Sequence, residues 1–130
     1  MRFTIFLFLL FIFTISFSQN ERGLARDGNM SYGDSLYSEA EIQYKKSLSK
    51  DSHFDEAKFN LSNTLFKQER YDESIDLLND IIKTTNDSVI KSEAYYNMGN
   101  NYMMMGEEGL QEAINAYQTI LDKLQYLYKE

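Results

Sequence analysis

The chain contains no cysteine and no proline, and His53 is its single histidine. Without cysteine the protein forms no disulfide, and it offers neither a nucleophilic thiolate nor the N-terminal cysteine that lipid attachment requires. A lone histidine provides no second imidazole for a metal site. The motifs G-x-S-x-G and H-E-x-x-H and the phosphate-binding loop are also missing from the sequence, so we expect a protein that is not an enzyme and binds no cofactor.

An apolar segment opens the chain. Residues 1–18 begin with one cation, Arg2, continue as an apolar run and end in Ser16-Phe17-Ser18, which fits the small-x-small pattern of a secretory cleavage site. The run is shorter than the roughly 20 residues that a membrane-spanning helix needs, so a retained anchor is the weaker interpretation. We therefore expect a signal peptide over residues 1–18, and a mature chain from residue 19 that is not inserted in the membrane.

Acidic residues outnumber basic ones, with 20 Asp and Glu against 13 Lys and Arg, which gives a net charge of −7. Loss of Arg2 with the signal peptide would change this charge to −8. Such a balance argues against nucleic acid or an anionic membrane surface as a partner. Six of the nine phenylalanines also lie in residues 1–18, whereas all ten tyrosines lie beyond them, so the expected core consists of Tyr, Leu, Ile and Met.

Three segments of the chain share one pattern. They are DGNMSYGDSLYSEAEIQYKKSL from Asp27, LSNTLFKQERYDESIDLLNDII from Leu61 and MGNNYMMMGEEGLQEAINAYQTIL from Met98. Tyr37 and Tyr71 are 34 residues apart, as are Asn29 and Asn63, and Gly99 follows Ser62 by 37 residues. A fixed period of this length is typical of repeat proteins, in which each unit buries its apolar face against the next unit.

Each copy also contains a recognisable motif. The third copy has Tyr95-x2-Met98-Gly99-x2-Tyr102 and Ala113-x3-Tyr117, the second has Lys58-x2-Leu61-Ser62-x2-Leu65 and Ser74-x3-Leu78, and the first has Leu24-x2-Asp27-Gly28-x2-Ser31 and Ala40-x3-Tyr44. This pattern resembles the tetratricopeptide repeat (TPR), whose period is about 34 residues. The resemblance implies an all-α solenoid of about three helix-turn-helix units, at approximately 21–54, 55–88 and 89–130, within one domain over 19–130.

The small residues of the motif predict close contacts between helices. We expect Gly28, Ser62 and Gly99 to lie where the second helix of each unit crosses the first, facing Ala40, Ser74 and Ala113. The second helices should stack on the following unit through an apolar stripe formed by Tyr44, Leu48, Leu78, Ile82, Tyr117 and Leu121.

The proline that closes a TPR unit is replaced by Ser52, Asn86 and Gln125. Ser52 followed by Asp55 predicts a capping box at the start of the next helix, and Asn86 predicts a turn or helix cap. Gln125 lies in an apolar run with helical spacing, so we expect an extended last helix. The three extra residues before the third copy and the two within GEEGL are expected to be loop insertions.

The stretch YYNMGNNYMMMG, residues 95–106, concentrates four methionines. Because successive residues of a helix point about 100° apart, Met103, Met104 and Met105 cannot bind one metal ion unless the helix unwinds. Methionine commonly fills irregular apolar gaps. We therefore expect structural or groove-lining methionines and no metal site, with a copper(I) site as a minor alternative.

TPR stacks usually bind an extended peptide on the concave surface of their first helices, and the resemblance implies such a groove here. It places there Asn29, Tyr32, Phe59, Asn63, Phe66, Lys67, Tyr96, Asn100, Met103 and Met104, with Arg22, Ala25, Gly33, Glu56 and Glu93 beside them. The three asparagines would form a ladder whose amides each donate to and accept from a peptide, unless they are only part of the repeat consensus. Aromatic residues and few lysines favour an apolar or neutral segment, or a partner's helix, over the carboxylate-clamp ligand of some TPR domains.

A narrower likeness rests on SFSQ, RDGN, SYGDSLYSEAEIQYKKSL, FNLSNTLFKQERYDES and AYYNMGNNYMMMG. Together these segments resemble the periplasmic TPR proteins of the Bat (aerotolerance) operon of Bacteroidetes, over nearly all of residues 19–130. The resemblance implies a periplasmic location. It also implies, as partners, the membrane-anchored von Willebrand factor type A proteins of the same operon.

These observations predict a non-enzymatic periplasmic protein–protein interaction module that acts as an adaptor or scaffold for an envelope complex. The alternative is a chaperone-like holder of unfolded or secreted chains. The last helix is rich in apolar residues, namely Ile120, Leu121, Leu124, Tyr126, Leu127 and Tyr128. It either folds back along the third unit or supports a homodimer, and we favour the homodimer.

Overall fold

The computed structural model describes residues 20–127, and all regular secondary structure in this range is helical. The expected signal peptide, the side chain of Leu127, and Tyr128 lie outside the described residues. The elements are α2 (Glu21–Gly33), α3 (Tyr37–Lys50), α4 (Asp55–Lys67), α5 (Tyr71–Thr84), α6 (Ser88–Met104) and α7 (Leu110–Leu127), with a 3-10 helix η1 (Gly106–Gly109) before α7. The all-α class that the sequence predicted is confirmed for this part of the chain.

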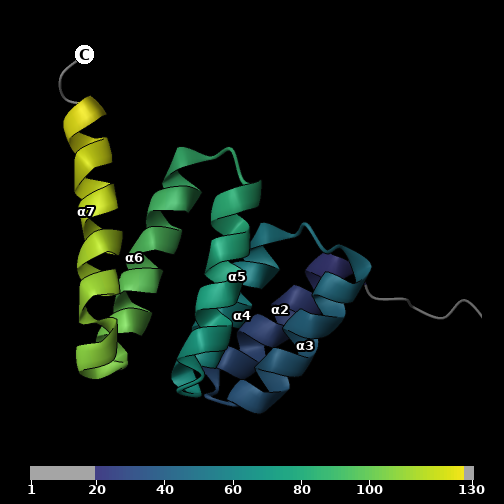
Figure 1. Cartoon of the computed structure of the whole chain (residues 1–130). Helices are drawn as coiled ribbons and strands as arrows, with labels where there is room; N and C mark the ends of the chain where they lie inside the picture. Colours follow the sequence, from purple (N-terminus) through teal and green to yellow (C-terminus); the bar gives the residue numbers. More distant parts are fainter. Residues whose placement is uncertain (1–19, 128–130) are drawn as a thin grey trace, which may run out of the picture.

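The six α-helices form three consecutive pairs, α2–α3, α4–α5 and α6–α7, and each helix packs against the next one along the chain (Figure 1). The first helices also touch across the pairs, α2 against α4 and α4 against α6. Among the described residues the second helices α3, α5 and α7 make no such contacts with one another. The first helices therefore form the inner side of a stack, in a repeat-like arrangement that agrees with the sequence period.

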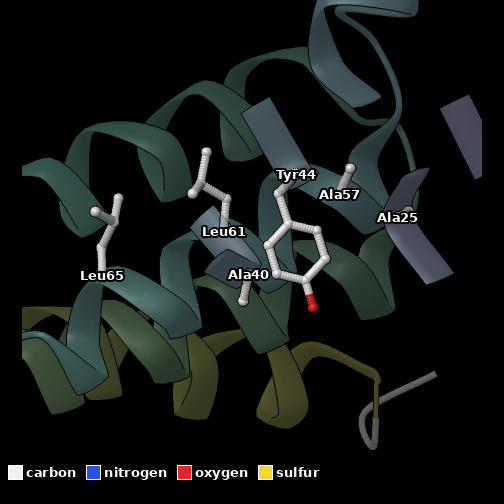
Figure 2. Close-up of a cluster of buried hydrophobic side chains, with 6 residues drawn as sticks. All are labelled: Ala25, Ala40, Tyr44, Ala57, Leu61 and Leu65. Carbon is white, nitrogen blue, oxygen red and sulfur yellow. The ribbon is translucent and has the colours of Figure 1, made fainter. Parts of the chain in front are cut away.

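Two clusters of buried side chains join the pairs. The first cluster, drawn in Figure 2 with Tyr44 in its middle, connects α2, α3 and α4 through Ala25, Ala40, Tyr44, Ala57, Leu61 and Leu65. The second cluster connects α5, α6 and α7 through Ile75, Leu78, Ile81, Ala94, Met98 and Ala116. Because both clusters span two pairs, a single pair does not bury its apolar residues alone, as expected of a repeat stack.

Small residues allow the two helices of a pair to cross closely. A β-carbon on Gly28 would lie 2.6 Å from the Tyr44 ring, and one on Gly99 would lie 2.5 Å from the Tyr117 ring. The tyrosines, rather than the expected Ala40 and Ala113, are thus the nearest neighbours of these glycines, because each ring reaches back over the crossing point. In the middle pair the expected contact is present: the Ser74 hydroxyl donates to the Ser62 carbonyl oxygen at 2.9 Å.

The turn inside each pair contains one residue with left-handed backbone. These residues are Ser35 (φ 61°), Glu69 (φ 60°) and Gly106 (φ 76°). Their separations of 34 and 37 residues are those of the sequence repeat, so the same turn is built three times. Only the third turn uses glycine, which adopts this conformation without a steric cost.

The two insertions of the third unit lie in different kinds of secondary structure. The pair of extra residues in GEEGL lies between the helices, in η1, as expected. The three extra residues before this unit do not lengthen a loop: α6 has 17 residues, whereas α2 and α4 have 13 each. They extend α6 at its start, where the Asp87 carboxylate accepts hydrogen bonds from the backbone N–H groups of Val89 at 2.7 Å and Ile90 at 3.2 Å.

The predicted capping box at Ser52 and Asp55 is wrong. Helix α4 begins directly after Phe54, so Ser52 lies too far before the helix to cap it. Phe54 packs against the first cluster, and this contact places the start of the helix. The preceding turn is held by Asp51, whose carboxylate accepts from the His53 backbone N–H at 2.9 Å.

Candidate functional site

A groove follows the inner side of the stack over α2, α4 and α6. It consists of four pockets of about 450, 260, 230 and 460 Å³. Neighbouring pockets share lining residues: Asn29 and Glu56 connect the first-unit end to the middle, and Phe59 and Glu93 connect the middle to α6. The depression is therefore continuous, and it ends at Ile120 of α7.

Asparagine side chains bridge the first helices along this groove. The Asn60 amide nitrogen donates to the Asn29 amide oxygen at 2.9 Å, which ties α4 to α2. The Asn97 amide nitrogen donates to the Asn63 amide oxygen at 3.0 Å, which ties α6 to α4. Asn60 and Asn97 are 37 residues apart and occupy the same place in their units, so the bridge repeats with the fold.

Tyrosine hydroxyls of the second helices reach the same row of asparagines. The Tyr44 hydroxyl donates to the Asn29 amide oxygen at 2.7 Å, and the Tyr117 hydroxyl donates to the Asn100 amide oxygen at 2.8 Å. Burial, helped by Tyr32 and Glu56, raises the pKa of Tyr44 to about 12. Burial also raises the pKa of Tyr117. Both hydroxyls are therefore protonated donors at neutral pH.

These hydrogen bonds change what the asparagine ladder can offer a ligand. The Asn29 oxygen accepts two bonds, which fills its acceptor capacity, and Asn63 and Asn100 accept one bond each. Within residues 20–127 the structure gives the amide nitrogens of these three residues no acceptor. The ladder is thus part of the fold, and its main free function is donation to a carbonyl oxygen of a bound chain.

The structure brings half of the predicted groove residues together. Asn29, Tyr32, Phe59, Asn63 and Tyr96 line the groove pockets. Phe66, Lys67, Asn100, Met103 and Met104 line none of these four pockets, because they lie further along their helices. Phe66 instead packs edge-on against Tyr71, with ring centroids 5.6 Å apart.

One residue that the TPR resemblance placed in the groove is in the core. Ala25 is 1% exposed and belongs to the first cluster, so it does not face a ligand. The helix register explains the difference, since Ala25 points towards α3 and α4 while Arg22, Arg26 and Asn29 line the groove.

Sequence reasoning missed Asn60 and Asn97, which make the interhelical bridges. A signal for them is present in the sequence, because NLSN (60–63) and NMGN (97–100) repeat an Asn-x2-Asn spacing at the period of the units. Ile120 was also missed as a groove residue. No sequence signal points to it, because it comes from α7, whose other residues do not line the groove pockets.

Charges are distributed unevenly along the groove. Arg22 and Arg26 lie at the first-unit end, together with Glu56. The middle is acidic, because Glu56 and Glu93 flank Phe59 in one pocket with Asp55. A segment with a basic residue next to an apolar one would be complementary to this middle part.

The methionines of residues 95–106 are divided between the core and the surface. Met98 and Met105 pack in or against the second cluster, whereas Met103 and Met104 are 51% and 57% exposed. Across residues 20–127 no group of three or more His, Cys, Asp or Glu side chains could hold a metal ion. No helix in the same range has the length and apolar character needed to cross a membrane.

Neither a protein-family model nor a curated protein sequence matches this chain. The repeated helix pairs and the groove that they form are therefore the basis on which a function can be proposed.

Proposed function

We propose that the chain is a TPR solenoid that acts as a non-enzymatic adaptor or scaffold, binding a segment of a partner protein in the groove over α2, α4 and α6. The observation that carries this proposal is the continuity of the groove, whose pockets share Asn29, Asn60 and Phe59. A long, open depression on an inner helical surface suits an extended segment or a helix, whereas small molecules usually bind in enclosed pockets.

The chemistry of the groove defines the segment that it would bind. The amide nitrogen of Asn63 can donate to a backbone carbonyl oxygen, and the rings of Phe59 and Tyr96 provide apolar contact area. Glu56 and Glu93 beside Phe59 add a preference for a lysine or arginine next to the apolar anchor. This preference refines the neutral segment expected from the sequence.

The proposed setting is the periplasm, because residues 1–18 have the pattern of a cleaved signal peptide. The resemblance to Bat-operon TPR proteins makes a membrane-anchored von Willebrand factor type A protein the first partner to test. In this arrangement the adaptor would connect such a protein to an envelope complex.

The test is calorimetric titration of the purified chain with the soluble domain of the proposed partner, a von Willebrand factor type A protein of the same organism. Tyr96→Ala removes an exposed groove ring, and Asn63→Asp keeps the oxygen that Asn97 binds but removes the free donor. Each change should weaken binding about tenfold, the equivalent of roughly 1.4 kcal/mol. Ile42→Ala, at an exposed position on α3, is the matched control and should bind like the wild type.

If all these variants bound the partner with the same affinity, the groove would not be the binding site. A second assay separates the chaperone alternative, since a holdase would suppress the aggregation of unrelated unfolded proteins. If the wild type did so and Tyr96→Ala did not, the groove would serve a chaperone-like holder instead of an adaptor.

A further inference from the structure

A second depression lies outside the groove, between α6 and α7, and we call it the outer notch. It has a volume of about 200 Å³, and its lining residues are Tyr95, Met98, Tyr102, Glu112, Asn115, Ala116 and Thr119. The four groove pockets share none of these residues. Met98 and Ala116 pack with residues of α5 in the second cluster, so the outer notch belongs to the junction between the second and third pairs.

At the corresponding place in the middle pair, the protein supplies its own cations. The repeat relates α6 to α4 by 37 residues, so that Tyr95 corresponds to Lys58. It relates α7 to α5 by 39 residues, so that Thr119 corresponds to Asp80. Lys58 is buried and forms an ion pair with Asp80. The outer notch therefore has neither member of this ion pair.

The second cation of the middle pair is an arginine. The Arg70 guanidinium binds both carboxylate oxygens of Glu73, with distances of 2.7 Å from Nε to Oε1 and 2.7 Å from Nη2 to Oε2. The third pair keeps the carboxylate as Glu112, but Gly109 corresponds to the arginine. A side chain does not fit there, because a β-carbon on Gly109 would lie 2.1 Å from the Tyr102 carbonyl oxygen. The outer notch therefore keeps the acceptor of a guanidinium without the guanidinium.

Negative charge surrounds the outer notch. Burial, and after it the charge of nearby carboxylates, raises the pKa of Tyr102. These carboxylates are Glu112 on α7 and Asp72 and Asp76 on α5. Within residues 20–127 the three form no ion pair, and in the same range no three such side chains lie close enough together to hold a metal ion. An organic cation, which is larger than a metal ion, therefore suits the outer notch.

We propose that the outer notch binds an arginine side chain of a partner protein. Its guanidinium lies against the rings of Tyr95 and Tyr102. It donates two hydrogen bonds to Glu112, as Arg70 does to Glu73. A lysine ammonium does not make this paired contact, because it is a point charge. Free arginine suits the outer notch less well than an arginine side chain, because its own carboxylate is repelled by Glu112 and by the acidic residues of α5.

An NMR titration of the isotope-labelled chain with the blocked peptide acetyl-glycyl-arginyl-glycine amide tests this proposal. The backbone amide signals of Tyr102, Gly109 and Glu112 should shift and saturate. The same peptide with citrulline in place of arginine has nearly the same shape without the charge, and it should bind at the outer notch at least about tenfold more weakly. Free arginine should also bind there more weakly than the blocked peptide.

Three variants assign the binding to the outer notch. Glu112→Gln removes the carboxylate charge with little change of shape and should weaken peptide binding at least about tenfold. Glu39→Gln removes the same charge from an exposed position of α3, the counterpart of residue 112 in the first pair, and should bind like the wild type. Tyr95→Lys combined with Thr119→Asp recreates the ion pair of the middle pair and should prevent binding, with unchanged circular dichroism.

Several results would overturn the proposal: equal shifts with the arginine and citrulline peptides, unchanged binding by Glu112→Gln, tighter binding of free arginine than of the peptide, or shifts confined to the groove around Glu56 and Glu93. The last result would leave the groove in place as a binding site. Because Tyr96→Ala and Asn63→Asp change no residue of the outer notch, the function proposed for the groove can fail or succeed separately.

Discussion

Gly99 lies against the ring of Tyr117 so closely that a β-carbon at position 99 would be 2.5 Å from the ring atom Cε1. Gly28 and Tyr44 repeat this relationship in the first pair, at 2.6 Å. The middle pair has Ser62 and Leu78 in the same two places, and both are fully buried. A ring on the second helix therefore goes with glycine on the first, and a smaller leucine goes with serine.

This matching predicts a coupled effect of two substitutions. Gly99→Ser should lower the free energy of unfolding by about 1–3 kcal/mol, because it overpacks the contact with the Tyr117 ring. Adding Tyr117→Leu recreates the Ser62–Leu78 combination and should recover part of this loss. Urea unfolding of the wild type, both single variants and the double variant gives the coupling energy. Purely additive losses would show that the ring does not limit the size of residue 99.

The left-handed turns predict substitutions that stabilise the protein. Glu69→Gly and Ser35→Gly should each raise the free energy of unfolding by about 0.5–1 kcal/mol, because glycine adopts a positive φ without strain. Gly106→Ala should lower it by about 1 kcal/mol for the same reason, since a β-carbon there meets no atom within 4 Å and only the backbone is affected.

Thermal denaturation of these three variants measures the effects, and Gly33 provides the control. It also has open space around its α-carbon, but it lies in a helix and has no positive φ. Gly33→Ala should therefore leave the melting temperature unchanged or raise it. A fall with Gly33→Ala as large as that with Gly106→Ala would contradict the backbone explanation.

Glu41 of α3 connects the first pair to the turn between α4 and α5. Burial alone would raise the pKa of its carboxyl group, but hydrogen bonds from Lys45 at 2.6 Å, Gln68 at 3.0 Å and Arg70 at 2.6 Å outweigh burial and lower this pKa from 4.5 to about 2. Because the folded-state pKa is lowered, the ionised group stabilises the fold above pH 4.5. This stabilisation is lost as the pH falls from 4.5 towards 2.

Glu41→Gln should therefore flatten the acid limb of stability against pH and cost about 1–3 kcal/mol at pH 7, the range for hydrogen bonds to a charged group. The measurement is the free energy of unfolding at several pH values between neutral and strongly acidic. Glu93→Gln, at an exposed position on α6, should keep the wild-type slope. If the free energy of unfolding of Glu41→Gln fell with acid as steeply as that of Glu93→Gln and the wild type, the hydrogen bonds of Glu41 would not contribute to acid sensitivity.

The hydroxyl of Tyr44 predicts a smaller, local effect. Tyr44→Phe removes its hydrogen bond to Asn29 and should lower the free energy of unfolding by about 1 kcal/mol. The ring remains in the first cluster, so the helical content should not change. Tyr96→Phe is the control, because the Tyr96 ring is exposed at 55% and tilted against Tyr117, and the structure gives its hydroxyl no hydrogen bond among residues 20–127. Equal losses in both variants would contradict a specific role for the Tyr44–Asn29 bond.

The sequence by itself determined the helix pairs and their order. Small and apolar residues that recur at one period, such as Gly28, Ser62 and Gly99, specify the same local packing wherever they occur, because each helix pair is stabilised mainly by its own crossing contact and by its neighbour. The extended last helix follows in the same way from apolar residues at helical spacing.

Only the tertiary structure decided which polar atoms of the groove are free. The asparagine oxygens are occupied by Tyr44, Asn60, Asn97 and Tyr117, which lie on other helices, so their availability depends on how the helices cross and not on any local pattern. The extra turn of α6 was decided by the Asp87 cap, because three inserted residues can form a loop or a helical turn at similar cost until a cap selects one. The exposure of Ile114, compared with the burial of Ile75, has the same origin: burial is a property of the neighbouring helix, which α5 has and which the described part of the chain does not supply to α7.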